Sequence, residues 1–351
     1  MSSYWKFISI VLVIVMLVIL PHFLTPFYLG LLISILFYAY LGQSWNIMSG
    51  FAGQLSFGHS AYFGIGAYTS TLLLVRWGLN PWIGMIIGGG VAMLFGLFTG
   101  YLSFRSGLRG LYFAFVTFAF SLALEAIAVN LDIVNKAMGL QVPLIHGDSW
   151  LRFQFETTKI PYYYIILVMV IMSIIVAHLI EQNKLGYYFR AIKEDQDAAN
   201  MLGINLMRYK MIAVAVSSFM TGIAGTFYAQ YFYFIDPFLT FGMSVNVDIL
   251  NTAIIGGVGT VFGPLVGAMI LTPLSEFTRT IIREPPVFLP FLLLLKGRAG
   301  VDLMLFGLLL ILVIIFMPYG VVGLIRAKWL QLKSHYEGRA GSSKELIQQP
   351  K

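Results

Sequence analysis

Residues 161–180 read PYYYIILVMVIMSIIVAHLI, a run that contains no Asp, Glu, Lys or Arg. A helix needs about 20 mostly apolar residues to cross roughly 30 Å of hydrocarbon, so this run predicts a transmembrane helix. Comparable runs recur at about 7–22, 28–48, 58–75, 82–104, 110–130, 210–234, 241–256, 262–282 and 302–325. The sequence therefore predicts an all-α, polytopic bundle of about ten transmembrane helices, with residues 1–325 as the membrane domain.

The composition excludes a soluble globular protein. Of the 351 residues, 59% are hydrophobic and only 11% are charged, whereas a soluble domain carries roughly 25% charged residues. The formal net charge is +7, and much of it lies in a basic tail at 326–351, directly after the last apolar run. Such a tail is typical of a cytoplasmic segment beside a membrane, so we do not expect nucleic-acid binding.

The sequence shows no catalytic constellation. The chain has no cysteine, and its five histidines show no metal-ligand spacing. It also lacks the Gly-x-x-x-x-Gly-Lys-Ser/Thr phosphate loop. We therefore expect a protein that is not an enzyme, without catalytic residues, metal or cofactor of its own. If transport here is driven by ATP, another polypeptide must bind the ATP and its Mg²⁺.

Basic residues predict the orientation, because Lys and Arg are enriched in short cytoplasmic loops. Arg105 and Arg109 mark one basic loop, the segment 181–210 marks a second, and the tail is a third. Ten spans with a cytoplasmic N-terminus place all three on the same side. We therefore expect a multi-pass protein of the bacterial inner membrane with both termini in the cytoplasm.

Two apolar stretches need separate interpretation. Residues 7–20 follow Lys6 as the core of a signal peptide would, but no small-residue cleavage site comes after them. We interpret them as a retained first span. Residues 285–295 are too few to cross the membrane, so we expect an outer re-entrant or interfacial piece.

Glycines gather in two clusters, one in each half of the chain. Residues 50–66 hold one cluster and residues 256–267 the other. Corresponding glycine interruptions in two halves can mark an internal repeat with a transport pathway between them. The spacings of the two clusters match poorly, so a repeat is one alternative only.

Uncharged polar residues are concentrated near the first glycine cluster. Polar groups within spans are costly in hydrocarbon, and they often mark a solute pathway. The candidates for pathway lining are Gln43, Asn46, Gln54, Ser56 and His59. The alternative is that they cap helix ends and form hydrogen bonds between helices.

Three carboxylates, Glu125, Asp248 and Glu276, also fall within or near predicted spans. Each is a candidate proton or cation relay of a carrier that works alone. Glu276 has Arg279 and Arg283 one or two turns further on, which favours a structural ion pair.

The segment 181–210 carries the most charge within the membrane domain. Ala191, Ala198, Ala199 and Leu202 recur at helical spacing, which predicts one short helix with a small, weakly apolar face. Gly203 supplies a C-terminal stop. Such a helix suits docking of a soluble partner, and a solvated linker is the alternative.

Four stretches resemble the permease subunits of branched-chain amino-acid ABC importers, in particular the M-type (LivM-like) subunit. They are residues 50–68, GFAGQLSFGHSAYFGIGAY, residues 108–120, LRGLYFAFVTFAF, residues 185–205, and residues 316–324, FMPYGVVGL. The third is the most specific, since it is similar to the family motif Gly-Arg-x-x-x-Ala-Ile-Arg-Glu-Asp-Glu-x-Ala-Ala-x-x-x-Gly-Ile-Asn. Tyr187 and Gln196 depart from that motif.

The resemblance implies a type II ABC-importer-like permease whose charged loop couples to an ATPase. By position, the coupling residues are Gly186, Arg190, Ala191, Ile192, Glu194, Asp195, Ala198, Ala199, Gly203 and Ile204. The implied partners are two ABC ATP-binding subunits, an H-type permease subunit and an extracytoplasmic solute-binding protein. The expected solutes are amino acids, with branched-chain ones first; urea or amides, and a stand-alone ion- or proton-coupled carrier, are the alternatives.

Overall fold

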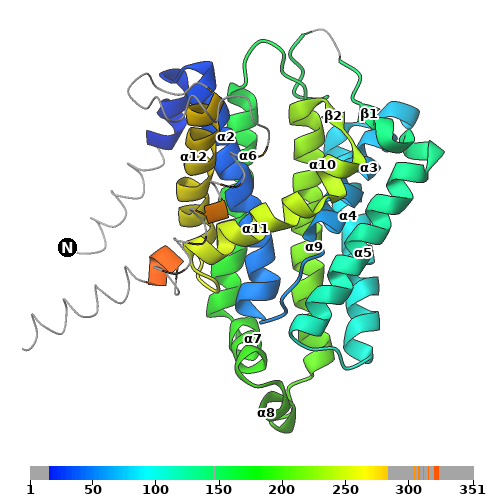
Figure 1. Ribbon diagram of the computed structural model, residues 1–351, viewed down its shortest axis with the longest axis vertical. Coiled ribbons are helices and arrows are strands. Elements are labelled where there is room, and N and C mark those ends of the chain that lie inside the picture. The colour runs from blue at the N-terminus through cyan, green and yellow to red at the C-terminus, as the bar shows by residue number, and fades with distance from the viewer. Residues whose placement is uncertain are drawn as a thin grey trace, which may run out of the picture.

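The computed structural model describes residues 16–144, 147–283 and 300, together with residues 304, 307, 308, 311, 315 and 320–323. Long helices stand side by side in one bundle (Figure 1). The long helices are α2 (Pro26–Trp45), α3 (His59–Trp77), α4 (Pro81–Arg105), α5 (Leu111–Asn130), α6 (Ile160–Gln182), α9 (Leu206–Phe232), α11 (Met243–Gly256) and α12 (Gly263–Arg283).

Shorter elements connect the long helices. They are η1 (Leu20–His22), η2 (Asn46–Phe51), η3 (Asp132–Val134), η4 (Lys136–Met138), α7 (Lys184–Glu194), α8 (Gln196–Met201) and α10 (Pro237–Phe241). Strands β1 (Leu140–Gln141) and β2 (Phe234–Ile235) pair antiparallel, with Leu140 opposite Ile235. This small ribbon ties the α5–α6 connection to the end of α9.

The predicted polytopic helical bundle is confirmed. Among the described residues, six helical stretches are long and apolar enough to cross a membrane: Pro26–Phe51, Pro81–Arg105, Leu111–Asn130, Ile160–Gln182, Leu206–Phe232 and Pro237–Gly256. Helices α3 and α12 match two further predicted spans in position but are more polar. Most of the first and tenth predicted spans, the stretch 284–299 and the tail 326–351 lie outside the described residues. The count of ten spans therefore stays a prediction.

The bundle has two groups of helices that meet at α9. Helices α3 and α4 pack against α9, while α2 packs against α6, α11, α12 and α9 (Figure 1). Glycines allow the closest of these approaches, because a Cβ on Gly66 of α3 would overlap the carbonyl oxygen of Gly222 of α9. Close backbone approach of this kind is the usual basis of helix association in lipid.

Polar side chains join the groups from inside. The hydroxyl of Ser44 on α2 lies 2.9 Å from that of Thr221 on α9, and Ser217 donates to the Ser44 carbonyl oxygen at 2.7 Å. Asn246 on α11 donates to the Ser60 hydroxyl on α3 at 2.7 Å and accepts from the Ser60 backbone N–H at 2.8 Å. These bonds satisfy groups that would otherwise be costly in a membrane interior.

Two predicted helices are interrupted in the structure. The predicted span 241–256 begins earlier, as α10, and the chain turns at Gly242 before α11. The prediction of a single short helix within 181–210 was wrong, since α7 and α8 are separate helices. In addition, α2 continues as the π-helix η2, a rare geometry that is frequent at functional sites.

Candidate functional site

The α7–α8 segment lies beyond the ends of the long helices, at the end of the bundle away from β1 and β2 (Figure 1). It consists of residues 184–203 and includes most of the predicted coupling residues. Gly186 lets α7 fold back against α6, because a Cβ there would overlap the carbonyl oxygen of Ile180. Phe189 and Ile192 are buried beneath α7, whereas Tyr187 and Arg190 face outward.

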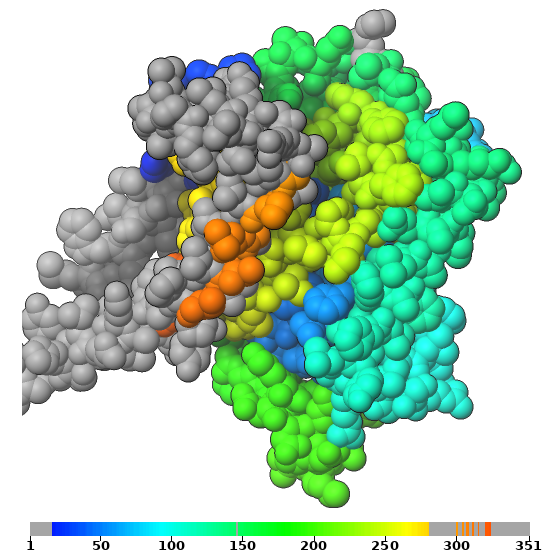
Figure 2. All heavy atoms as spheres, in the orientation of Figure 1, coloured from blue at the N-terminus to red at the C-terminus, as the bar shows by residue number. Residues whose placement is uncertain are grey.

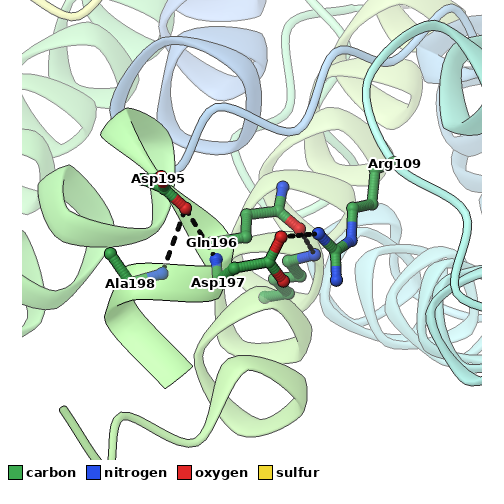
Figure 3. A network of polar contacts seen from close by, with 6 residues as sticks. Arg109, Asp195, Gln196, Asp197 and Ala198 are labelled. Atoms are coloured by element: carbon green, nitrogen blue, oxygen red, sulfur yellow. Dashed lines mark hydrogen bonds and ion pairs between the residues drawn. The ribbon is translucent and has the colours of Figure 1, made fainter. Parts of the chain in front are cut away.

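Asp195 separates the two helices. Its backbone is extended, with φ −152° and ψ 115°, and its carboxylate accepts from the backbone N–H groups of Asp197 at 2.8 Å and Ala198 at 3.0 Å. Figure 3 shows this carboxylate directed at the start of α8. Asp is among the preferred N-cap residues because its side chain satisfies these free donors. The extended backbone at Asp195 ends α7, and its side chain begins α8.

Gly203 ends α8, as the sequence predicts. Its φ is +80°, its N–H donates to the carbonyl of Asn200, and the N–H of Ile204 donates to the carbonyl of Ala199. This pair of bonds is the Schellman motif, which favours glycine because of the positive φ.

Side chains from two other elements hold α8. Arg109, in the α4–α5 loop, forms an ion pair with Asp197 at 2.8 Å (Figure 3). Lys210 on α9 donates to the side-chain oxygen of Gln196 at 2.6 Å. The hydrogen bond from Arg109 holds the pKa of the Asp197 carboxyl below its usual value, and the same bond raises the pKa of Arg109. Both side chains are largely exposed, so their contact orients α8 more than it stabilises the fold.

Lys193, near the end of α7, contacts the first glycine cluster and lies beside Gly259 of the second. Its ammonium donates to the Gly50 carbonyl oxygen at 2.9 Å, and the backbone of Gly53, with φ +68°, lies against the Lys193 side chain. Asn46 bridges the same place, since it donates to the Thr260 carbonyl at 2.9 Å and accepts from the Gly259 N–H at 2.7 Å.

We call these residues, Asn46, Gly50, Lys193, Gly259 and Thr260, the Lys193 cluster. The clusters at 50–66 and 256–267 thus meet directly beneath α7. The sequence did not predict that these two clusters meet, and its only signal was that both segments are rich in glycine.

A family model described as "Branched-chain amino acid transport system / permease component" matches residues 27–316. The chain belongs to this family. This permease is 26% identical to the high-affinity branched-chain amino acid transport system permease protein LivM of Escherichia coli K12, over 85% of this chain and 70% of that protein. It is 21% identical to LivH of the same strain, over 82% and 91%, and 24% identical to BraD of Pseudomonas aeruginosa, over 82% and 91%. No solved structure gives a significant match.

The predicted coupling residues of this permease occupy three environments. Gly186, Ile192 and Ala199 are buried, and Ala191 and Ile204 are half-buried. Arg190, Glu194, Asp195, Ala198 and Gly203 are exposed. Arg190 forms an ion pair with Glu181 at the end of α6, at 3.1 Å. Glu181, Arg109 and Lys210 hold the segment, but the sequence gives no sign of this, because their partners lie on other elements.

The five predicted pathway residues, Gln43, Asn46, Gln54, Ser56 and His59, are all buried in the described part of the permease. Asn46 belongs to the Lys193 cluster. The His59 ring lies 2.8 Å from the Ser217 hydroxyl, and Gln54 donates to the Ala52 carbonyl at 2.9 Å. The side-chain nitrogen of Gln43 has no partner among the described residues. Their role in solute passage stays a prediction.

Proposed function

We propose that this chain is the membrane-spanning permease subunit of an ABC importer that carries branched-chain amino acids across a bacterial inner membrane. ATP hydrolysis belongs to two partner ATP-binding subunits. An H-type permease subunit completes the membrane part, and an extracytoplasmic binding protein delivers the solute. The names of the relatives support the solute class and the division into several permease chains.

The observation that carries the proposal is the surface of the α7–α8 segment. Met201 and Leu202 at the tip of α8 are 87% and 79% exposed, and they lie outside the candidate spans. Exposed apolar residues grouped in this way are typical of a protein contact. Ala198 is exposed on the same helix and leaves room for a partner.

The base of the segment supports the same proposal. The Lys193 cluster joins α7 to η2 and to the turn before α12, while Arg109 joins α8 to the α4–α5 loop. A partner that moves the α7–α8 segment therefore acts on both groups of helices at once. On this basis the segment faces the cytoplasm. Closing and reopening of the ATPase dimer there exposes the pathway alternately to each side of the membrane.

The test is Met201→Glu, with Asn200→Glu as the matched control that adds the same charge to the same exposed helix. An interface hot spot contributes about 2 kcal/mol or more, so Met201→Glu should lower recovery of the ATP-binding subunits with the tagged permease by more than about tenfold. Asn200→Glu should lower it far less. Equal recovery with both variants, each monodisperse in detergent, would show that the tip of α8 is not the docking surface.

A second measurement tests the solute class. The assembly in proteoliposomes should take up labelled L-leucine when ATP is supplied, and urea should not compete. Uptake by the permease alone under a proton gradient would instead indicate a stand-alone carrier.

A further inference from the structure

A cavity of about 480 Å³, with both charged and apolar residues in its lining, lies among α2, α11 and α12. Its lining includes Tyr38 of α2, Asp248 of α11, and Thr272, Ser275, Glu276 and Arg279 of α12. Ligand sites in proteins commonly measure about 300–1,000 Å³, so the cavity has room for a small solute. On the face shown in Figure 2, α10 and α11 (yellow-green to yellow) lie at the surface beside the described residues near 307 (orange), and Gly307 also lines the cavity.

Helix α12 presents a polar stripe to this cavity. Thr272, Ser275, Glu276 and Arg279 follow one another at i, i+3, i+4 and i+7, so they share one face of the helix. Asp248 faces them from α11, within the candidate span Pro237–Gly256. Ionisable residues at this depth are expensive, and they usually mark the path of a polar solute or ion.

The charged groups of the cavity are loosely satisfied by one another. Glu276 and Arg279 are 3.7 Å apart, and their side chains are 38% and 47% exposed. The Tyr38 hydroxyl reaches Asp248 at 3.5 Å, the outer limit of a hydrogen bond. Polar groups left in this state within a membrane are available to a ligand at low cost.

Apolar residues complete the lining. Val247 and Leu271 border the cavity beside the charged groups. The cavity therefore offers an anionic group, a cationic group and an apolar wall within one small volume. This combination matches an α-amino acid, which carries an ammonium, a carboxylate and a side chain on one carbon.

We propose that this cavity is a transit site for the zwitterionic α-amino acid, an inference that rests on the function proposed above. Asp248, with the Tyr38 hydroxyl, receives the ammonium. Arg279 binds the carboxylate. Val247 and Leu271 contact the branched side chain. Arg279 leaves its loose pair with Glu276 to bind the solute, and the pair forms again when the solute leaves. Binding therefore stays weak enough for release.

The absence of cysteine from the chain allows a direct test. Ser275→Cys places a single thiol in the cavity, and Ser106→Cys, on the exposed connection after α4, is the matched control. A trimethylammonium methanethiosulfonate labels the thiol in the complete assembly in proteoliposomes. We expect saturating L-leucine to slow labelling of the Ser275→Cys variant by about tenfold. Isocaproate and isopentylamine, which each lack one of the two charges, should slow it much less, and none should affect Ser106→Cys.

Two further variants test the residue roles. Asp248→Asn and Arg279→Gln should each lower leucine uptake and leucine protection by about tenfold, since each removes one charge-assisted contact. The control is Asp132→Asn, which removes an exposed carboxylate from η3, outside the cavity lining. Asp248→Glu, which keeps the charge, should recover part of the uptake.

The outcomes separate this inference from the function proposed above. If the assembly takes up leucine but leucine does not protect the thiol at position 275, the cavity is not on the solute path. The same conclusion follows if Asp248→Asn and Arg279→Gln transport as Asp132→Asn does. If the wild-type assembly takes up no leucine with ATP, the proposed function itself fails.

Discussion

The contact between Lys193 and Gly50 predicts how strongly motion of α7 reaches the membrane helices. Lys193→Met keeps the length of the side chain and removes the ammonium that donates to the Gly50 carbonyl at 2.9 Å. A hydrogen bond from a charged donor contributes about 1.5–3 kcal/mol when it is buried. Lys193 is an exposed residue, and water competes for its ammonium, so we expect about 1 kcal/mol.

A free energy of about 1 kcal/mol corresponds to about a fivefold change in an equilibrium between two states. In the Lys193→Met assembly, we therefore expect up to a fivefold fall in the leucine transported per ATP hydrolysed. The assay measures labelled leucine uptake and phosphate release in the same proteoliposomes. Lys184→Met is the matched control, because Lys184 is also exposed on α7 and its side chain has no hydrogen bond or ion pair among the described residues. An unchanged ratio in Lys193→Met would refute the assignment of coupling to the Lys193 cluster.

Two other predictions concern the ion pairs of the α7–α8 segment. Arg190→Glu places two carboxylates together at the end of α6 and should lower stability by about 0.5–1 kcal/mol and weaken ATPase recovery, whereas adding Glu181→Arg should restore both, since the pair is then reversed. If the double variant recovers stability but not assembly, Arg190 contacts the partner directly. The depressed pKa of Asp197 means that its pairing with Arg109 stabilises the protein above the unfolded pKa of about 3.9 and that this stability is lost as pH falls through the lower, folded pKa. The thermal midpoint of Asp197→Asn in detergent should therefore lie slightly below wild type at pH 5–7 and converge with it as the pH falls through the folded pKa. A difference that stayed the same from pH 7 down into acid below that pKa would contradict the ion-pair assignment.

The sequence was sufficient for local features whose cause is local. An apolar run such as 161–180 must be helical in lipid, because only then do its own backbone groups satisfy one another. The structure accordingly has α6 at Ile160–Gln182. Gly203 was also predictable as the end of a helix, since a positive φ favours glycine whatever surrounds it.

The break between α7 and α8 shows where the sequence pattern was insufficient. The alanine spacing from Ala191 to Leu202 suits one continuous helix, and the pattern gives no sign of a break. The Asp195 side chain instead caps a new helix, and Arg109 and Lys210 from other elements hold that helix in its place. Contacts from remote residues therefore accompany a break that helical periodicity alone does not show.

The candidate sites depended still more on the tertiary structure. Sequence alone identified the charged segment 181–210, the polar residues near the first glycine cluster and the carboxylates Asp248 and Glu276. It did not show that Lys193 contacts Gly50, 143 residues away, or that Tyr38 contacts Asp248, 210 residues away. Hydrophobicity identifies each transmembrane helix separately, but it does not determine which helices become its neighbours in the bundle. Their neighbours are chosen by close packing at glycines and by interhelical hydrogen bonds, and these depend on side chains from several helices at once.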